Sequence, residues 1–146
     1  MRNSETPIFA PDLTPKQMLH LGVFGGYYFE GQHDEFPADW FDAPNVNHTG
    51  FDVEANYFRV AAGLTRDQWQ AKGWITHEDP LGWFQWYCRY FMGRRIEHVD
   101  QFQIARWKAF GPRHKGGIRS NCEPGDIWCR PRQRQALLQW AYDPFF

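Results

Sequence analysis

The stretch Gly82–Arg95, GWFQWYCRYFMGRR, combines six aromatic side chains with three arginines. At about 3.6 residues per turn, its aromatic and sulfur-containing side chains surround almost the whole circumference of a helix. Only a narrow stripe, which includes Arg89, is polar or small. A helix that is apolar on nearly every side is typical of a buried helix. The sequence therefore predicts a central aromatic helix at about residues 80–93.

Arg89 is the charged residue within this predicted helix. A guanidinium in a protein interior keeps its proton, so it needs a partner there. Acidic residues upstream, for example Asp34, Glu35 or Asp39, are candidate partners. Two interpretations follow. Arg89 is a structural strut if a carboxylate pairs with it, and a ligand-binding group if it faces a cavity that an anion completes.

Capping signals predict the other helices. Thr14 and Thr65 are each followed three residues later by a glutamine, which is the capping-box pattern. The Asp79-Pro80 pair marks the start of the aromatic helix, and Gly111-Pro112 marks a break between two later helices. The expected helices are Thr14 to Gly22, Thr65 to Lys72, 80–93, Glu97 to Phe110, Arg113 to Asn121 and Pro131 to Tyr142.

No segment shows the alternation of a strand, so the expected fold is all-α. We expect a compact single-domain helical bundle over residues 1–146, with an extended arm at 1–13 and a helical core at 14–143. The N-terminal half is rich in loops, because glycines and prolines punctuate residues 23–56. Aromatic residues make up 18% of the chain, so rings must build much of the core.

The net charge of −1 argues against a protein that is basic all over, but the charges are unevenly distributed. Residues 1–88 hold five Lys/Arg and twelve Asp/Glu, whereas residues 89–134 hold eleven and four. The two halves either pair with each other in the fold or leave a basic face for a partner. The sequence does not choose between these alternatives.

Arginine outnumbers lysine by twelve to four. Arginine suits bidentate contacts with phosphate or carboxylate and stacks on rings. Together with interleaved tryptophans, this pattern predicts an anion-binding site for nucleic acid or a phosphorylated ligand. The candidate residues are Arg89, Arg94, Arg95, Arg106, Arg119, Arg132 and Trp107.

Two alternative functions stay open. One is an enzyme that combines the arginine-lined site with an acid from the loop at 27–36, for which Glu35, Asp34 and His114 are the catalytic candidates. The other is a structural or partner-binding protein whose charge asymmetry mediates assembly. No motif names a reaction, a cofactor or a nucleotide fold, so the sequence does not decide whether the protein is an enzyme.

The chain contains three cysteines, Cys88, Cys122 and Cys129, and no pair of cysteines or histidines at zinc-ligand spacing. We expect no metal site. The N-terminus lacks the pattern of a secretory signal, and no apolar run is long enough to span a membrane, which together predict a cytoplasmic protein. In that compartment reduced thiols are expected, and a disulfide between Cys122 and Cys129 is a less favoured alternative.

The segments GWITHEDPLGWFQWYCRYFMGRR, DQFQIARW, RH at 113–114 and CRPRQRQALLQWAYD resemble a family of small uncharacterised bacterial, fungal and algal proteins. The resemblance covers about half of the chain, and EFPADWF at 35–41 extends it forward. It implies that the region 73–143 forms one structural unit with the N-terminal part. Because the family has no known activity, the resemblance implies no catalytic residues.

Overall fold

A computed structural model describes residues 8–47, 49–63 and 65–146. This part of the chain contains five α-helices and no strand, which confirms the all-α prediction. The helices are α1 (Pro15–Leu21), α2 (Arg66–Ala71), α3 (Trp83–Phe91), α4 (Glu97–Asn121) and α5 (Pro131–Leu138). Three short 3-10 helices, η1 (Phe24–Gly26), η2 (Ala38–Phe41) and η3 (Val53–Ala55), lie in the loop-rich N-terminal half. Residues 1–7 of the predicted arm lie outside the described residues.

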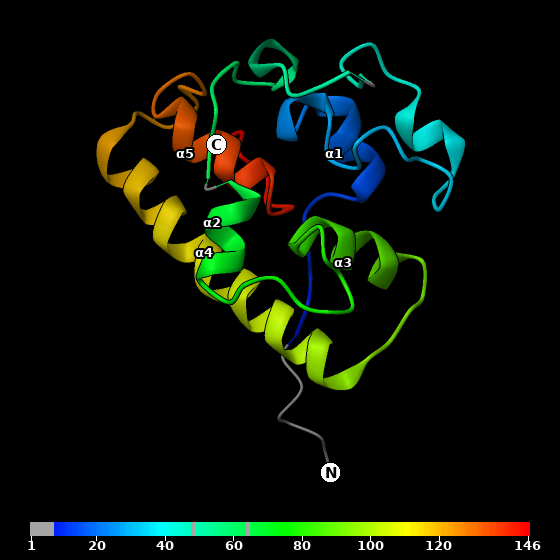
Figure 1. The fold of residues 1–146 in the computed structure, drawn as a ribbon. Helices are drawn as coiled ribbons and strands as arrows, with labels where there is room; N and C mark the ends of the chain where they lie inside the picture. Colours follow the sequence, from blue (N-terminus) through cyan, green and yellow to red (C-terminus); the bar gives the residue numbers. More distant parts are fainter. Residues whose placement is uncertain (1–7, 48, 64) are drawn as a thin grey trace.

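The long helix α4 forms one side of the molecule and contacts both α3 and α5 (Figure 1). Helix α1 contacts α3 and η2, so the N-terminal half folds over the opposite side of the aromatic helix (Figure 1). Both predicted capping boxes are present, at Thr14 before α1 and at Thr65 before α2. These local signals therefore fix where the two shortest α-helices begin.

Helix α3 is buried as predicted, since every residue from Trp83 to Cys88 is buried. Its last aromatic residue and the following methionine are not, because Phe91 is 47% exposed and Met92 is 54% exposed. The helix begins later than Asp79-Pro80 suggests. Gly82 precedes its first turn with a φ of 109°, a conformation that favours glycine. Asp79 is thus free to pair with arginines, as described below.

The predicted break at Gly111-Pro112 is wrong, because α4 continues through Pro112 to Asn121. The helix is held on the C-terminal segment at this point. The Trp107 ring stacks on the Tyr142 ring at 4.9 Å between centroids, and the Tyr142 hydroxyl donates a hydrogen bond to the Trp107 carbonyl. This packing keeps both sides of the proline helical, and tertiary contacts commonly override local propensity in this way.

Helix α5 begins at Pro131 as predicted but ends at Leu138 rather than near Tyr142. Ala141 adopts a φ of 65°, and the Tyr142 N–H donates to the Leu137 carbonyl. The chain therefore turns sharply after α5, and this turn carries Tyr142 onto α4.

Gly111 marks the closest approach between α4 and Tyr142, and it generates a prediction. A methyl group on Gly111 would overlap the Tyr142 ring, so Gly111→Ala should lower the free energy of unfolding by about 2 kcal/mol, within the range of overpacking. Gly116→Ala in the same helix meets no atom within 4 Å. It should instead raise stability by up to about 1 kcal/mol through helix propensity.

Urea unfolding of the two variants checks this prediction. Equal stability of the two variants would contradict the close packing of Gly111 on Tyr142.

Candidate functional site

Arg89 is a structural strut, because two carboxylates form ion pairs with its guanidinium group. Its Nε and NH2 groups donate to Glu35 at 2.6 and 2.8 Å, and its NH1 group donates to Asp79 at 3.0 Å. The hydrogen bonds from Arg89 to Glu35 come first among the causes that raise the pKa of Arg89. Of the two interpretations of Arg89, the structure supports the one in which a carboxylate is the partner.

Asp79 is the centre of this ion cluster. Its side chain is fully buried and accepts from Arg94 through both oxygens, at 2.8 and 2.7 Å, in addition to Arg89. Two arginines from either side of the end of α3 therefore share one carboxylate. Because buried charges are tolerated only when paired, neither Arg89 nor Arg94 is available to a ligand at low cost.

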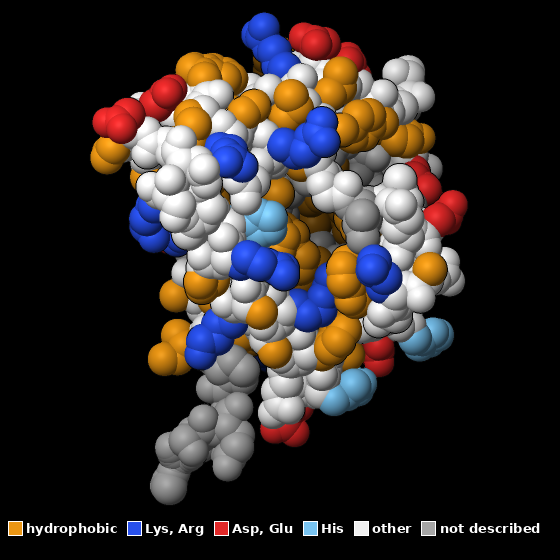
Figure 2. Space-filling model, turned by 90° about the vertical axis from the view of Figure 1, so that its left-hand side faces the viewer, with side chains coloured by type: hydrophobic (Ala, Val, Ile, Leu, Met, Phe, Trp, Pro, Cys, Tyr) orange, Lys and Arg blue, Asp and Glu red, His pale blue; other side chains and the backbone are white. Residues whose placement is uncertain are grey.

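A pocket of about 820 Å³ opens between α4, α5 and the segment that follows α2. Figure 2 shows this hollow with hydrophobic side chains inside it and several Lys or Arg side chains around its opening. Its aromatic lining consists of Phe24, Trp69, Trp74, Trp83, Phe84, Phe110 and Trp140. Its ionisable lining consists of Arg106, Arg113, His114, Arg130 and Arg132. Among the described residues that line it, none is an aspartate or a glutamate.

Arg106 lies half-buried among rings, whereas the other arginines of this pocket are exposed. Its guanidinium is 4.9 Å from the centre of the Trp74 ring and 5.2 Å from that of Trp140. Its NH1 group donates to the Trp74 carbonyl at 3.2 Å and to Gln103 Oε1 at 2.9 Å. Burial lowers the pKa of Arg106 to about 10, so it still carries its charge at neutral pH.

No carboxylate pairs with Arg106 in the part of the chain that the structure describes. Its partly buried charge is therefore stabilised by cation–π contacts and by hydrogen bonds to the neutral oxygens of Trp74 and Gln103. The rim arginines Arg113, Arg130 and Arg132 are exposed and likewise form no ion pair with the described residues. The pocket thus concentrates positive charge over an apolar interior.

His114 also lines the pocket, and its ring stacks on the Phe110 ring at 4.2 Å between ring centres. Burial, and to a lesser degree the charge of Arg113, lowers the pKa of His114 below its usual value. The ring is therefore neutral at neutral pH. Its Nδ1 atom is buried and has no hydrogen-bond partner among the described residues.

The structure brings together three of the residues that the sequence singled out, namely Arg106, Arg132 and His114. It places the others elsewhere. Arg95 lies over the Tyr90 ring, Arg119 lies over the Phe146 ring, and Trp107 is buried against Tyr142. Asp34 is exposed, and Glu35 lies with Arg89 and Arg94 at a separate depression of about 380 Å³. The acids of the loop at 27–36 therefore do not line the large pocket.

The candidate residues from sequence omitted Arg113, Arg130 and most of the aromatic lining. Trp69, Trp74 and Trp140 come from three separate segments, so no spacing in the sequence links them. The sequence did contain a signal for Arg130. Arg130 belongs to the same basic run, 130–134, as the candidate Arg132, and it directly precedes the predicted start of the last helix at Pro131.

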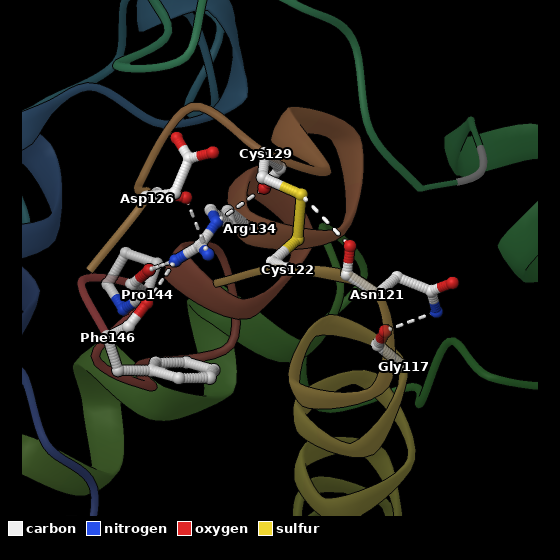
Figure 3. The surroundings of a disulfide bond; sticks show 8 residues. All are labelled: Gly117, Asn121, Cys122, Asp126, Cys129, Arg134, Pro144 and Phe146. Carbon is white, nitrogen blue, oxygen red and sulfur yellow. Dashed lines mark hydrogen bonds between the residues drawn. A yellow bond between two sulfur atoms is a disulfide. The ribbon is translucent and has the colours of Figure 1, made fainter. Parts of the chain in front are cut away.

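The loop that leads to the rim is closed by a disulfide between Cys122 and Cys129, so the expectation of reduced thiols at these positions is wrong (Figure 3). Helix α4 ends at Asn121, and the turn that follows folds the chain back on itself. Arg134 holds this turn, since its buried guanidinium donates to the carbonyls of Asp126 and Cys129 at 2.9 and 2.6 Å. Cys88 remains a free, buried thiol.

Arg134 also donates to the carbonyls of Pro144 and Phe146, at 2.7 and 2.9 Å (Figure 3). This fully buried arginine is therefore structural, because backbone carbonyl oxygens accept hydrogen bonds from its guanidinium group. Through Arg134 and the disulfide, the loop at 122–129 is fixed, and Arg130 follows it directly at the rim of the pocket.

No group of three His, Cys, Asp or Glu side chains in the described parts of the chain is placed to hold a metal ion. None of the helices there has both the length and the apolar character that crossing a membrane requires.

No family model, no curated protein and no solved structure matches this chain. This result is consistent with the resemblance to an uncharacterised family.

The Asp79 cluster yields a stability prediction. Asp79→Asn removes the charge shared by two partly buried arginines, so the free energy of unfolding should fall by about 3 kcal/mol. Glu35→Gln removes a partner that is 48% exposed, and it should cost less than about 1 kcal/mol. Urea unfolding measures both. A loss for Glu35→Gln as large as that for Asp79→Asn would show that Asp79 is not the centre of the cluster.

The disulfide yields a second stability prediction. Replacing Cys122 and Cys129 by serine should lower the free energy of unfolding by about 2 kcal/mol, because a closed loop of this length restricts the unfolded chain. A reductant should cause a similar loss in the natural protein and none in the double variant. If the reductant destabilises both proteins equally, the effect does not come from this bond.

Proposed function

We propose that this protein binds a phosphorylated ligand with a flat, largely apolar ring. The ring enters the aromatic pocket, and the phosphate lies against the rim arginines. The observation that carries the proposal is the lining of the pocket, which combines seven aromatic side chains with four arginines and, among the described residues, no carboxylate.

The size and shape of the pocket favour a small organic ligand. Its volume of about 820 Å³ lies within the usual range for ligand pockets, roughly 300–1,000 Å³. Aromatic walls from α3, α4 and the segment after α2 offer ring faces and edges at several orientations. Offset and edge-to-face contacts with a flat ring are the arrangements that such walls stabilise best.

The charges favour a phosphate. Arg113, Arg130 and Arg132 present three guanidinium groups at the opening, and the planar fork of arginine matches phosphate oxygens. A phosphate carries more than one negative charge at neutral pH, which suits several cations better than a single carboxylate does. Arg106 lacks a counter-ion within the described chain and adds a donor deeper in the pocket.

A nucleic-acid strand is the alternative that the charge distribution raised. Strand binding needs a continuous basic track along the surface. Here two of the candidate arginines are paired within the chain, Arg89 with Glu35 and Asp79 and Arg94 with Asp79. The arrangement therefore supports a small ligand over a strand. We propose binding for this pocket, since the acids Asp34 and Glu35 of the enzyme hypothesis do not line it.

Calorimetric titration with naphthyl phosphate tests the proposal, with naphthol and inorganic phosphate as single-group controls. Naphthyl phosphate should bind more tightly than either control, since it alone supplies both the ring and the charge. Arg106→Met should weaken it at least tenfold, because a charge-assisted hydrogen bond is worth about 1.5–3 kcal/mol. Arg119→Gln, an arginine outside the pocket, is the matched control and should leave binding unchanged.

Two results would contradict the proposal. One is the absence of binding of naphthyl phosphate at any salt concentration. The other is tight binding of single-stranded oligonucleotides that weakens steeply with salt and responds equally to Arg106→Met and Arg119→Gln, since that would indicate a diffuse strand-binding surface.

The cytoplasmic location that the sequence predicts stays a hypothesis. The disulfide between Cys122 and Cys129 points instead to an oxidising compartment, because reducing compartments keep most thiols reduced. Alkylation of the protein in intact cells, followed by mass spectrometry, distinguishes three labelled cysteines from one.

A further inference from the structure

We infer that Arg106 forms a second anion position in the pocket, separate from the rim arginines. The ligand then carries a carboxylate at the end of its ring system opposite the phosphate, and Arg106 binds this carboxylate. This inference rests on the proposed function and narrows its ligand class to phosphorylated aromatic carboxylic acids.

Arg106 keeps part of its guanidinium group free. Its NH1 group donates to the Trp74 carbonyl and to Gln103 Oε1. Its Nε and NH2 groups donate no hydrogen bond to the described residues, and neither of these nitrogens is fully buried. Arg106 lines the pocket, and so do two of the rings that its guanidinium contacts, those of Trp74 and Trp140. The free edge of the guanidinium is therefore open to a ligand in the pocket.

Arg106 and the rim arginines lie toward opposite ends of the pocket. Helices α4 and α5 run antiparallel (Figure 1). Gln133, near the start of α5, packs on Gly117 of α4, whereas Trp140, just after α5, stacks on Phe110 at 4.7 Å between ring centres. The rim arginines at the start of α5 therefore lie near the later turns of α4, whereas Arg106 lies beside Trp140.

The same separation exists along α4. Arg113 lies two turns after Arg106 on the same face, which is a rise of about 10 Å. The Arg106 guanidinium contacts Phe102 and Gln103, one turn earlier, so it is directed away from Arg113. The Phe110 ring lies on the helix between the two arginines. A single phosphate therefore contacts one end at a time, whereas a flat ring system with an anion at each end contacts both.

The surroundings of each position favour a different anion. Arg106 is half-buried and carries one charge, so a carboxylate balances it, whereas a doubly charged phosphate would leave excess charge among the rings. The planar edge of a guanidinium also matches the two oxygens of a carboxylate. The rim presents three exposed arginines, which suit the higher charge of a phosphate.

Calorimetric titration with three ligands at one salt concentration tests the inference. They are 2-naphthyl phosphate, 6-(phosphonooxy)-2-naphthoate, whose anionic groups lie at opposite ends of the ring system, and 3-(phosphonooxy)-2-naphthoate, whose anionic groups are adjacent. The 6-isomer should bind the natural protein about tenfold more tightly than either of the others, because its carboxylate adds a charge-assisted contact with Arg106. The 3-isomer is the matched control for total charge.

Two variants assign the preference to Arg106. Arg106→Met should reduce the preference for the 6-isomer to within about twofold, because its carboxylate then meets no cation. Arg119→Gln, which lies outside the pocket, should leave the preference at about tenfold. Thermal unfolding verifies that both variants are folded, and the comparison of the two isomers on the natural protein needs neither variant.

The outcomes separate this inference from the proposed function. If naphthyl phosphate binds but the 6-isomer binds no more tightly than the 3-isomer, or if the preference survives Arg106→Met, the second anion position is overturned and the proposed function stands. If naphthyl phosphate does not bind the natural protein, the proposed function fails and the second anion position fails with it.

Discussion

The buried carboxylate of Asp79 is the interaction on which the arrangement of the aromatic helix depends. It accepts hydrogen bonds from Arg89 within α3 and from Arg94 just after it, so the chain on both sides of the helix is tied to one point. This tie fixes the position of the first turn of α3, where Trp83 and Phe84 form part of the pocket wall. A buried charge shared in this way is costly to disrupt, because removing it leaves two guanidinium groups uncompensated.

The same cluster divides the arginines into two groups. Arg89 and Arg94 are paired with Glu35 and Asp79, whereas Arg106, Arg113, Arg130 and Arg132 pair with no carboxylate of the described chain. Of the two alternatives raised by the uneven charge distribution, internal pairing is present around Asp79, and a basic face for a partner stays a proposal. Internal pairing holds the core, and the remaining cations surround an aromatic pocket.

The sequence predicted features that depend on neighbouring residues. The burial of α3 followed from its aromatic periodicity, and the starts of α1 and α2 followed from the capping boxes at Thr14 and Thr65. It missed features that depend on distant partners. The helix continues past Pro112 because Tyr142 packs there, and Asp79 does not cap α3 because Arg89 and Arg94 bind it.

The pocket is the clearest case of such a distant feature. Trp69, Trp74 and Trp140 line one pocket, and the latter two contact Arg106, only after α2, α4 and the turn after α5 have packed together. The disulfide likewise depends on the turn between α4 and α5, which hydrogen bonds from Arg134 hold. Which of the candidate arginines share a pocket depends on the tertiary fold.

The tryptophans provide the most direct test of the central claim that the pocket between α4 and α5 is the ligand site. Four of the eight line the pocket, namely Trp69, Trp74, Trp83 and Trp140, and the other four lie elsewhere. Nuclear magnetic resonance of the indole N–H groups during titration with naphthyl phosphate reports on each of them. The account predicts saturable shifts that are concentrated in the four pocket tryptophans. Shifts confined to the other four, or no saturable shift at all, would contradict it.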